Sequence, residues 1–166
     1  MNIKKLTNLA LFTALAMIIF AVESAIPPVI PIPGIKLGLA NIITLVLLRS
    51  CSAADTLLVL LMRIFLSAFL FGQAMSLLYS LAGGLLCFAA MFLINRLLKG
   101  HYIYLTGILG GIFHNLGQLA VAWLITRTPG VLAYLPFLML SGILTGLFTG
   151  LCAHFMQKYL TPFIRR

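Results

Sequence analysis

Apolar residues run along most of the chain in long stretches, broken by short polar, glycine-rich or proline-rich segments. These stretches predict helices at about residues 6–22, 35–48, 56–71, 74–97, 102–125 and 131–155. A helix needs about 20 mostly apolar residues to cross a bilayer, and the second stretch is short for a full span. We therefore predict an all-α integral membrane protein, a six-transmembrane-helix bundle that forms one domain over residues 1–166.

The first break is rich in proline, with Pro27, Pro28, Pro31 and Pro33 followed by Gly34. Proline lacks the backbone N–H and fixes φ, so this segment cannot continue a helix. Irregular backbone is not tolerated where it faces lipid. The segment is therefore expected outside the bilayer or folded over the helix ends, as a lid above a pocket.

Composition excludes a soluble protein, because 63% of the residues are hydrophobic and only 8% are charged. Soluble domains carry about 25% charged residues. The formal net charge of +9 does not indicate nucleic-acid binding, because the basic residues lie between apolar runs. With a cytoplasmic N-terminus, the inner segments hold eight of the eleven basic residues: Lys4, Lys5, Arg49, Arg96, Lys99, Lys158, Arg165 and Arg166.

Lys36 and Arg127 fall in the outer loops, and Arg63 falls inside the third helix. This bias follows the positive-inside rule. We predict a multi-pass protein of the cell membrane with both termini in the cytoplasm. The first apolar run resembles a signal peptide, but spanning segments follow it, so it is expected to remain as the first helix.

The cysteines Cys51, Cys87 and Cys152 have no metal-binding or disulfide spacing, and no phosphate-binding Gly-x-x-x-x-Gly-Lys-Ser/Thr loop occurs. No metal site, cofactor or ATP hydrolysis is therefore predicted for this chain.

Small residues recur at spacings of four, which place them on one helix face and allow close approach of another helix. Ala10 and Ala14 form such a pair in the first helix, and either internal packing or a partner interface would explain them. The last helix has a longer ridge, for which we favour internal packing: Gly142, Gly146 and Gly150. Gly107 and Gly111 on the fifth helix offer a groove that could face it.

Arg63 lies about two turns into the third helix, where a charge costs roughly 2.5–3.5 kcal/mol on insertion scales. It either faces the bundle interior or extends toward the cytoplasmic surface. Asp55 lies in the same region and could neutralise it.

His114, Asn115 and Gln118 form a polar cluster in the fifth helix, and groups at that depth need hydrogen-bond partners. They either hold helices together or form the floor of a pocket for a polar solute. Other polar residues expected to join such a pocket are Glu23, Lys36, Asn41, Thr44, Gln73 and Ser76.

Two segments, Ile30-Pro-Ile-Pro-Gly-Ile-Lys-Leu-Gly-Leu-Ala-Asn41 and Gly111-Ile-Phe-His-Asn-Leu-Gly-Gln118, carry a family resemblance. With the Ala-xxx-Ala pair and the short helices, the chain resembles the substrate-binding S component of energy-coupling factor (ECF) transporters. More specifically, it resembles the family known both as Gx transporter and as heptaprenyl diphosphate synthase component I.

The resemblance implies capture of a small solute from outside, with Pro27 through Lys36 as the gate and the Ala10–Ala14 face docking a coupling membrane subunit. Two ATPase subunits would supply the energy for uptake of a vitamin or other micronutrient. On this basis the solute contacts are expected at Asn41, His114, Asn115 and Gln118, with Arg63, Lys36 and Glu23 nearby.

The synthase name suggests a different activity. Prenyl chain elongation uses paired aspartate-rich motifs that hold Mg²⁺, for which carboxylates are suitable ligands. This chain has only Asp55 and Glu23, so we predict that it is not an enzyme by itself. A non-catalytic membrane subunit in isoprenoid or quinone metabolism is the alternative function, and a self-contained small channel or carrier is a third.

Overall fold

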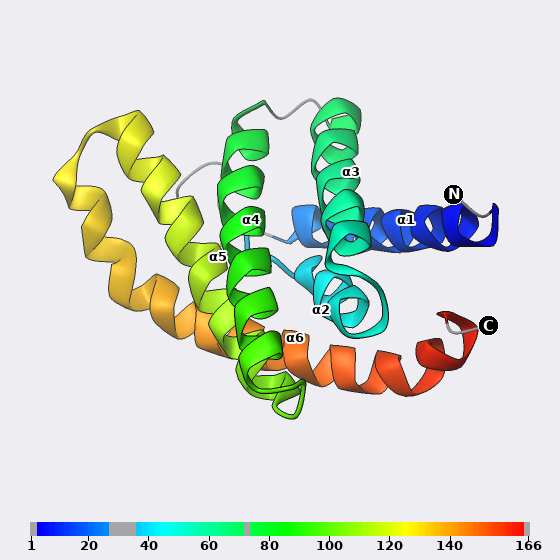
Figure 1. Ribbon diagram of the computed structural model, residues 1–166. Coiled ribbons are helices and arrows are strands. Elements are labelled where there is room, and N and C mark those ends of the chain that lie inside the picture. Colours follow the sequence, from blue (N-terminus) through cyan, green and yellow to red (C-terminus); the bar gives the residue numbers. More distant parts are fainter. Residues whose placement is uncertain (1–2, 27–35, 72–73, 165–166) are drawn as a thin grey trace.

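The computed structural model describes residues 3–26, 36–71 and 74–164. This part of the chain is helical apart from its connections (Figure 1). The helices are α1 (Ile3–Ala25), α2 (Asn41–Ser50), α3 (Ala53–Phe71), α4 (Ala74–Leu97), α5 (Ile103–Thr126), the 3-10 helix η1 (Pro129–Tyr134) and α6 (Leu135–Ile164). The expected proline lid, Gly34 and Gln73 lie outside the described residues.

Five segments are long and apolar enough to cross a membrane: α1, α3, α4, α5 and the continuous stretch of η1 and α6. The exception among the predicted spans is α2, which has 10 residues and is therefore about 15 Å long. The hydrocarbon core of a bilayer is about 30 Å thick. The described part of the chain is thus that of a multi-pass, all-helical membrane protein with five helices of spanning length, and the predicted sixth span is not confirmed.

The short helix α2 lies in the core of the bundle. All eight residues from Asn41 to Leu48 are buried, and α2 contacts α1, α3, α4, α5 and α6. A helix that is apolar on all sides is expected to be enclosed by others. Its predicted start near residue 35 is wrong, because residues 36–40 are not helical and Gly38 has a φ of +81°.

The last two helices pack closely along their glycines. A side chain at Gly107 would collide with the backbone of Gly146 and Gly150, and one at Gly111 would collide with Gly142 and Gly146. The ridge of α6 therefore lies in a groove of α5. The predicted limits of this last helix are wrong at both ends: η1 precedes it, and α6 runs from Leu135 to Ile164 instead of 131 to 155.

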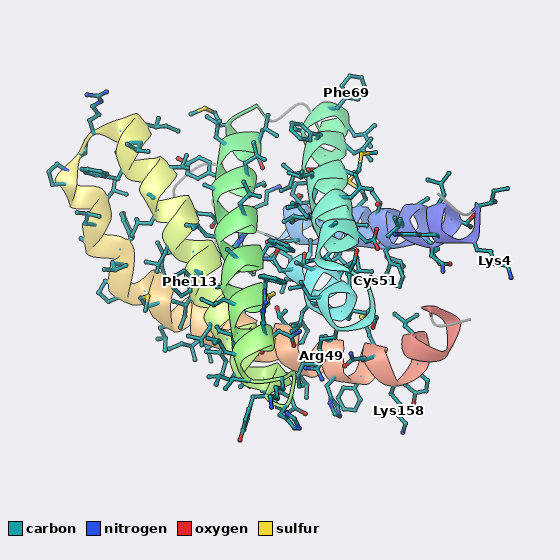
Figure 2. The ribbon with its side chains drawn as sticks, viewed as in Figure 1. Lys4, Arg49, Cys51, Phe69, Phe113 and Lys158 are labelled. Carbon is teal, nitrogen blue, oxygen red and sulfur yellow. The ribbon has the colours of Figure 1, made fainter. Side chains whose placement is uncertain are left out.

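Many large apolar side chains lie on the outside of the bundle. Phe69, which is 85% exposed, extends away from the end of α3 (Figure 2). Phe113 is exposed on α5. Such surfaces are stable in lipid, where apolar side chains replace the polar coat of a soluble protein.

Contacts between helix ends define two ends of the bundle. At the first, which we call the Arg49 end, Lys5 pairs with Asp55 at 2.7 Å and Arg49 donates to Gln157 at 3.0 Å. The opposite end, which we call the Glu23 end, lies where α1 finishes and α2 begins. Since Asp55 pairs with Lys5, the expectation that it neutralises Arg63 is wrong.

Candidate solute-binding site

Glu23 holds the chain that enters α2. Its Oε1 accepts a hydrogen bond from the Gly38 N–H at 2.6 Å, and its Oε2 accepts one from the Leu39 N–H at 2.9 Å. The side chain is only 5% exposed. Two backbone N–H groups are suitable partners for a buried carboxylate, because hydrogen bonds to charged groups are stronger than neutral ones. Glu23 therefore fixes the end of α1 against the start of α2.

Lys36, in the connection before α2, contacts both the end of α1 and α5. Its Nζ donates to the Ser24 hydroxyl at 2.8 Å and lies 3.7 Å from the centroid of the Phe20 ring. Its backbone N–H donates to Oε1 of Gln118 at 3.4 Å. Burial lowers the pKa of the Lys36 ammonium group, while the Glu23 carboxylate opposes this shift. Lys36 thus links the connection before α2 to both α1 and α5.

Arg63 faces the bundle interior, so it does not extend to the surface. It is 4% exposed, and its Nη2 donates to Oδ1 of Asn41 at 3.5 Å. Within the described part of the chain, no carboxylate lies within ion-pair distance of Arg63. Glu23 attracts this guanidinium only from beyond ion-pair distance, and the amide contact is long, so Arg63 can accept a further anionic or acceptor-rich partner.

The His114 ring lies in a slot between two glycines. A Cβ at Gly38 would lie 2.7 Å from its Nε2, and a Cβ at Gly83 of α4 would lie 2.9 Å from its Nδ1. Both distances are too short for a real side chain, so the two glycines make room for the imidazole. The ring is 3% exposed.

Hydrogen bonds assign the protons of this ring. Oε1 of Gln118 accepts from Lys36, so Nε2 of Gln118 donates to Nε2 of His114 at 3.1 Å. In a neutral imidazole the proton then lies on Nδ1. This buried atom has no hydrogen-bond partner of normal geometry among the described residues.

Asn115 points toward α6 instead. Its Nδ2 donates to the Leu138 carbonyl oxygen at 2.7 Å. This contact supports the helix-packing interpretation for Asn115. The remaining polar residues share one junction: Glu23 of α1, Lys36 before α2, Asn41 of α2, Arg63 of α3, and His114 and Gln118 of α5. We call these six residues the polar junction.

Two other predicted members make no side-chain hydrogen bond to the polar junction among the described residues. Thr44 and Ser76 are buried, and Oγ of Ser76 has no hydrogen-bond partner among the described residues. Sequence reasoning missed three residues of the site. Gly38 and Gly83 form the slot for the His114 ring, and Ser24 accepts a hydrogen bond from Lys36. The positive φ of Gly38 leaves a glycine signal in the sequence, whereas nothing marks Gly83 and Ser24 as neighbours of the polar junction.

The two alanines of α1 lie away from this site. Ala10 and Ala14 are both exposed, whereas Leu9, Phe12 and Ala16 of the same helix are buried. One face of α1 thus packs on the bundle while the Ala10–Ala14 face remains uncovered by the described part of the chain.

The described residues contain no group of three or more His, Cys, Asp or Glu side chains that could hold a metal. The polar junction offers hydrogen-bond donors and positive charge rather than a nucleophile with an adjacent base.

One sequence family matches most of the chain. The family described as heptaprenyl diphosphate synthase component I matches residues 12–156. No curated protein and no solved structure matches the chain.

Proposed function

The chain belongs to the heptaprenyl diphosphate synthase component I family, and within it we propose a substrate-capture subunit of an ECF-type uptake transporter. The polar junction would bind a small solute that arrives from outside. A coupling membrane subunit would dock on α1, and two ATPase subunits would drive uptake of a micronutrient.

The observation that carries this proposal is the polar junction itself. Four helices and the connection before α2 place charged and amide groups together inside a membrane protein. Each unsatisfied polar group there costs about 1–3 kcal/mol. Ionisable residues within spanning segments are functional-site candidates for that reason. Packing alone explains Asn115, but it does not explain the long amide contact of Arg63 or the buried Nδ1 of His114, whose contact with the Gly83 backbone falls outside normal hydrogen-bond geometry.

The charges of the polar junction support an anionic or acceptor-rich solute. Lys36 and Arg63 supply two positive charges, against one negative charge on Glu23, which two backbone N–H groups already occupy. Neutral His114 adds a donor at Nδ1. A carboxylate, or a ring with several acceptors, would complement these groups.

The proposal requires the Glu23 end to face outward. The bias of basic residues supports that orientation, since the Arg49 end carries Lys4, Lys5, Arg96 and Lys99. The solute would then enter beside the connection between α1 and α2.

The exposed face of α1 supports reversible docking of a partner. Ala10 and Ala14 are exposed and four residues apart, so a second helix could approach the α1 backbone closely. Co-expression with a coupling subunit and two ATPases tests this. The single variants Ala10→Leu and Ala14→Leu should each weaken the complex, while Ala89→Leu, the same change at an exposed alanine of α4, should leave it intact. An intact complex in both α1 variants would contradict the proposal.

The family description favours a second candidate function, a non-catalytic membrane subunit that serves a prenyl diphosphate synthase. The two acidic residues lie near opposite ends of α1: Asp55 pairs with Lys5, which is about 27 Å by helix rise from Glu23. They cannot hold one Mg²⁺–diphosphate group together, which supports an accessory role. This function would be favoured if the chain binds tightly to a soluble prenyl synthase and if replacing Ala10 and Ala14 by leucine does not change that binding. Solute flux through the purified chain alone would instead favour a self-contained carrier.

A further inference from the structure

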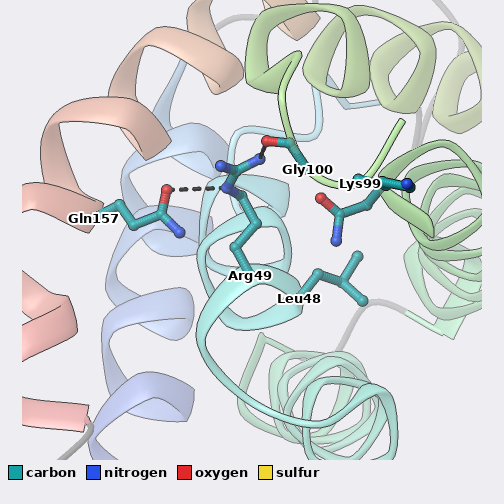
Figure 3. A pocket seen from close by; sticks show the side chains of 6 residues that line it. Leu48, Arg49, Lys99, Gly100 and Gln157 are labelled. Atoms are coloured by element: carbon teal, nitrogen blue, oxygen red, sulfur yellow. Dashed lines mark hydrogen bonds between the residues drawn. The ribbon is translucent and has the colours of Figure 1, made fainter. Parts of the chain in front are cut away.

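A second polar site lies at the Arg49 end, away from the polar junction. A cavity of about 320 Å³ opens there between the ends of α2, α4 and α6 and the connection from α4 to α5 (Figure 3). Its lining residues are Leu48, Arg49, Asn95, Lys99, Gly100 and Gln157. Two of these six residues are cations, and the lining contains no acidic residue.

Arg49 is held in a fixed orientation within this cavity. Its Nε donates to Oε1 of Gln157 at 3.0 Å, and its Nη1 donates to the Gly100 carbonyl oxygen (Figure 3). These contacts leave Nη2 of Arg49 without a hydrogen bond among the described residues. A guanidinium held through Nε and Nη1 keeps the N–H groups of Nη2, which can donate to a phosphate oxygen.

Asn95 adds an acceptor beside this cation. Its Oδ1 is buried and has no hydrogen-bond partner within the described ranges. A Cβ built at Gly100 would lie 3.5 Å from this oxygen and 3.5 Å from Nη1 of Arg49, so the missing side chain of Gly100 leaves space between them. A ligand that fills this space would combine phosphate oxygens with a hydroxyl or ammonium donor.

The surroundings are those of a membrane interface. Tyr102, Tyr104 and Tyr159 are exposed near this end of the bundle, and Lys158 lies over the Tyr159 ring. Tyrosines concentrate at the head-group level of membranes. Basic pockets between spanning helices at that level bind anionic lipid head groups.

We infer that the Arg49 cavity binds the phosphate group of a membrane amphiphile, with Arg49 and Lys99 at the phosphate and Asn95 accepting from a donor on the head group. The observations favour a phospholipid such as phosphatidylglycerol, whose hydroxyls supply that donor. The inference does not depend on the proposed function, because the cavity and the polar junction share no residue.

Native mass spectrometry of the purified protein with phosphatidylglycerol tests this inference. Lys99→Gln removes an exposed cation from the cavity, and Arg127→Gln is the matched control at a distant exposed site. Lys99→Gln should weaken binding about five-fold, since a basic residue near a lipid surface contributes about that factor. Arg127→Gln should leave it unchanged.

Competing ligands distinguish the sources of the phosphate. Phosphatidylcholine carries the phosphate without a donor and should bind less tightly than phosphatidylglycerol. Displacement by farnesyl diphosphate at lower concentrations, again sensitive to Lys99→Gln, would assign the phosphate site to a prenyl diphosphate and would overturn the head-group contact at Asn95, because this ligand carries no hydroxyl or ammonium donor. Equal effects of the two substitutions, or equal competition by phosphatidylcholine or inorganic phosphate, would overturn the inference.

Discussion

Replacing Glu23 by glutamine should measurably loosen the entry into α2. The carboxylate accepts from the N–H groups of Gly38 at 2.6 Å and Leu39 at 2.9 Å in a buried setting. Glutamine keeps one acceptor but turns the other oxygen into an NH₂ donor, which faces a backbone donor. One hydrogen bond to a charged group is lost, and such bonds contribute about 1.5–3 kcal/mol.

We therefore expect Glu23→Gln to lower the free energy of unfolding by about 2 kcal/mol. For a chain of this length, 1 kcal/mol shifts the unfolding temperature by roughly 2–4 °C, so the decrease should be about 4–8 °C. Thermal unfolding in one detergent at neutral pH measures it. Hydrogen exchange should also accelerate at the amides of Gly38 and Leu39, because these lose their acceptors.

Asp55→Asn is the matched control, because it changes the only other acidic residue of the chain. Asp55 pairs with Lys5, whose side chain is 48% exposed, and exposed ion pairs contribute only about 0–1 kcal/mol. The control should therefore lose far less stability. Equal losses in the two variants, with unchanged exchange at Gly38 and Leu39, would refute the role assigned to Glu23.

Three further substitutions or measurements test other contacts. Gly107→Val should push α6 away and lower stability by about 1–3 kcal/mol in thermal unfolding, whereas Gly130→Ala meets only a methyl group at 3.7 Å and should change little. Gly83→Ala should displace the His114 ring and reduce retention of the solute several-fold. Unchanged retention would show that His114 does not take part in solute binding. Burial raises the pKa of the Cys51 thiol, so its alkylation by iodoacetamide, with the other cysteines replaced, should reach half its maximal rate above pH 9.0; a midpoint below that value would contradict the burial.

Much of the fold follows from apolar run length. The limits of α4 and α5 were predicted to within a residue, because glycine, charge and polar breaks bound these runs. The predicted start of α2 was wrong because residues 36–40 are apolar apart from Lys36, while contacts with Glu23 and the positive φ of Gly38 keep them out of a helix. A hydrogen bond between residues 15 apart leaves no periodic signal in the sequence.

The residue types of the candidate site were predictable, but their partners were not. Polar residues in apolar helices stand out, as Arg63 and His114 do. The pairing of Asp55 with Lys5 instead of Arg63 depends on how α1 and α3 pack. The Arg49 cavity brings together residues from 48 to 157 and was not predicted, because Asn95 and Gln157 resemble ordinary helix-end residues.

Mass spectrometry of small molecules retained by the purified protein tests the central claim most directly. The account predicts a reproducible polar, acceptor-rich metabolite bound near one per chain, which Gly83→Ala depletes and Gly130→Ala does not. Retention of lipid or isoprenoid alone, with no polar metabolite in either the unmodified protein or the control, would contradict capture of a solute at the polar junction.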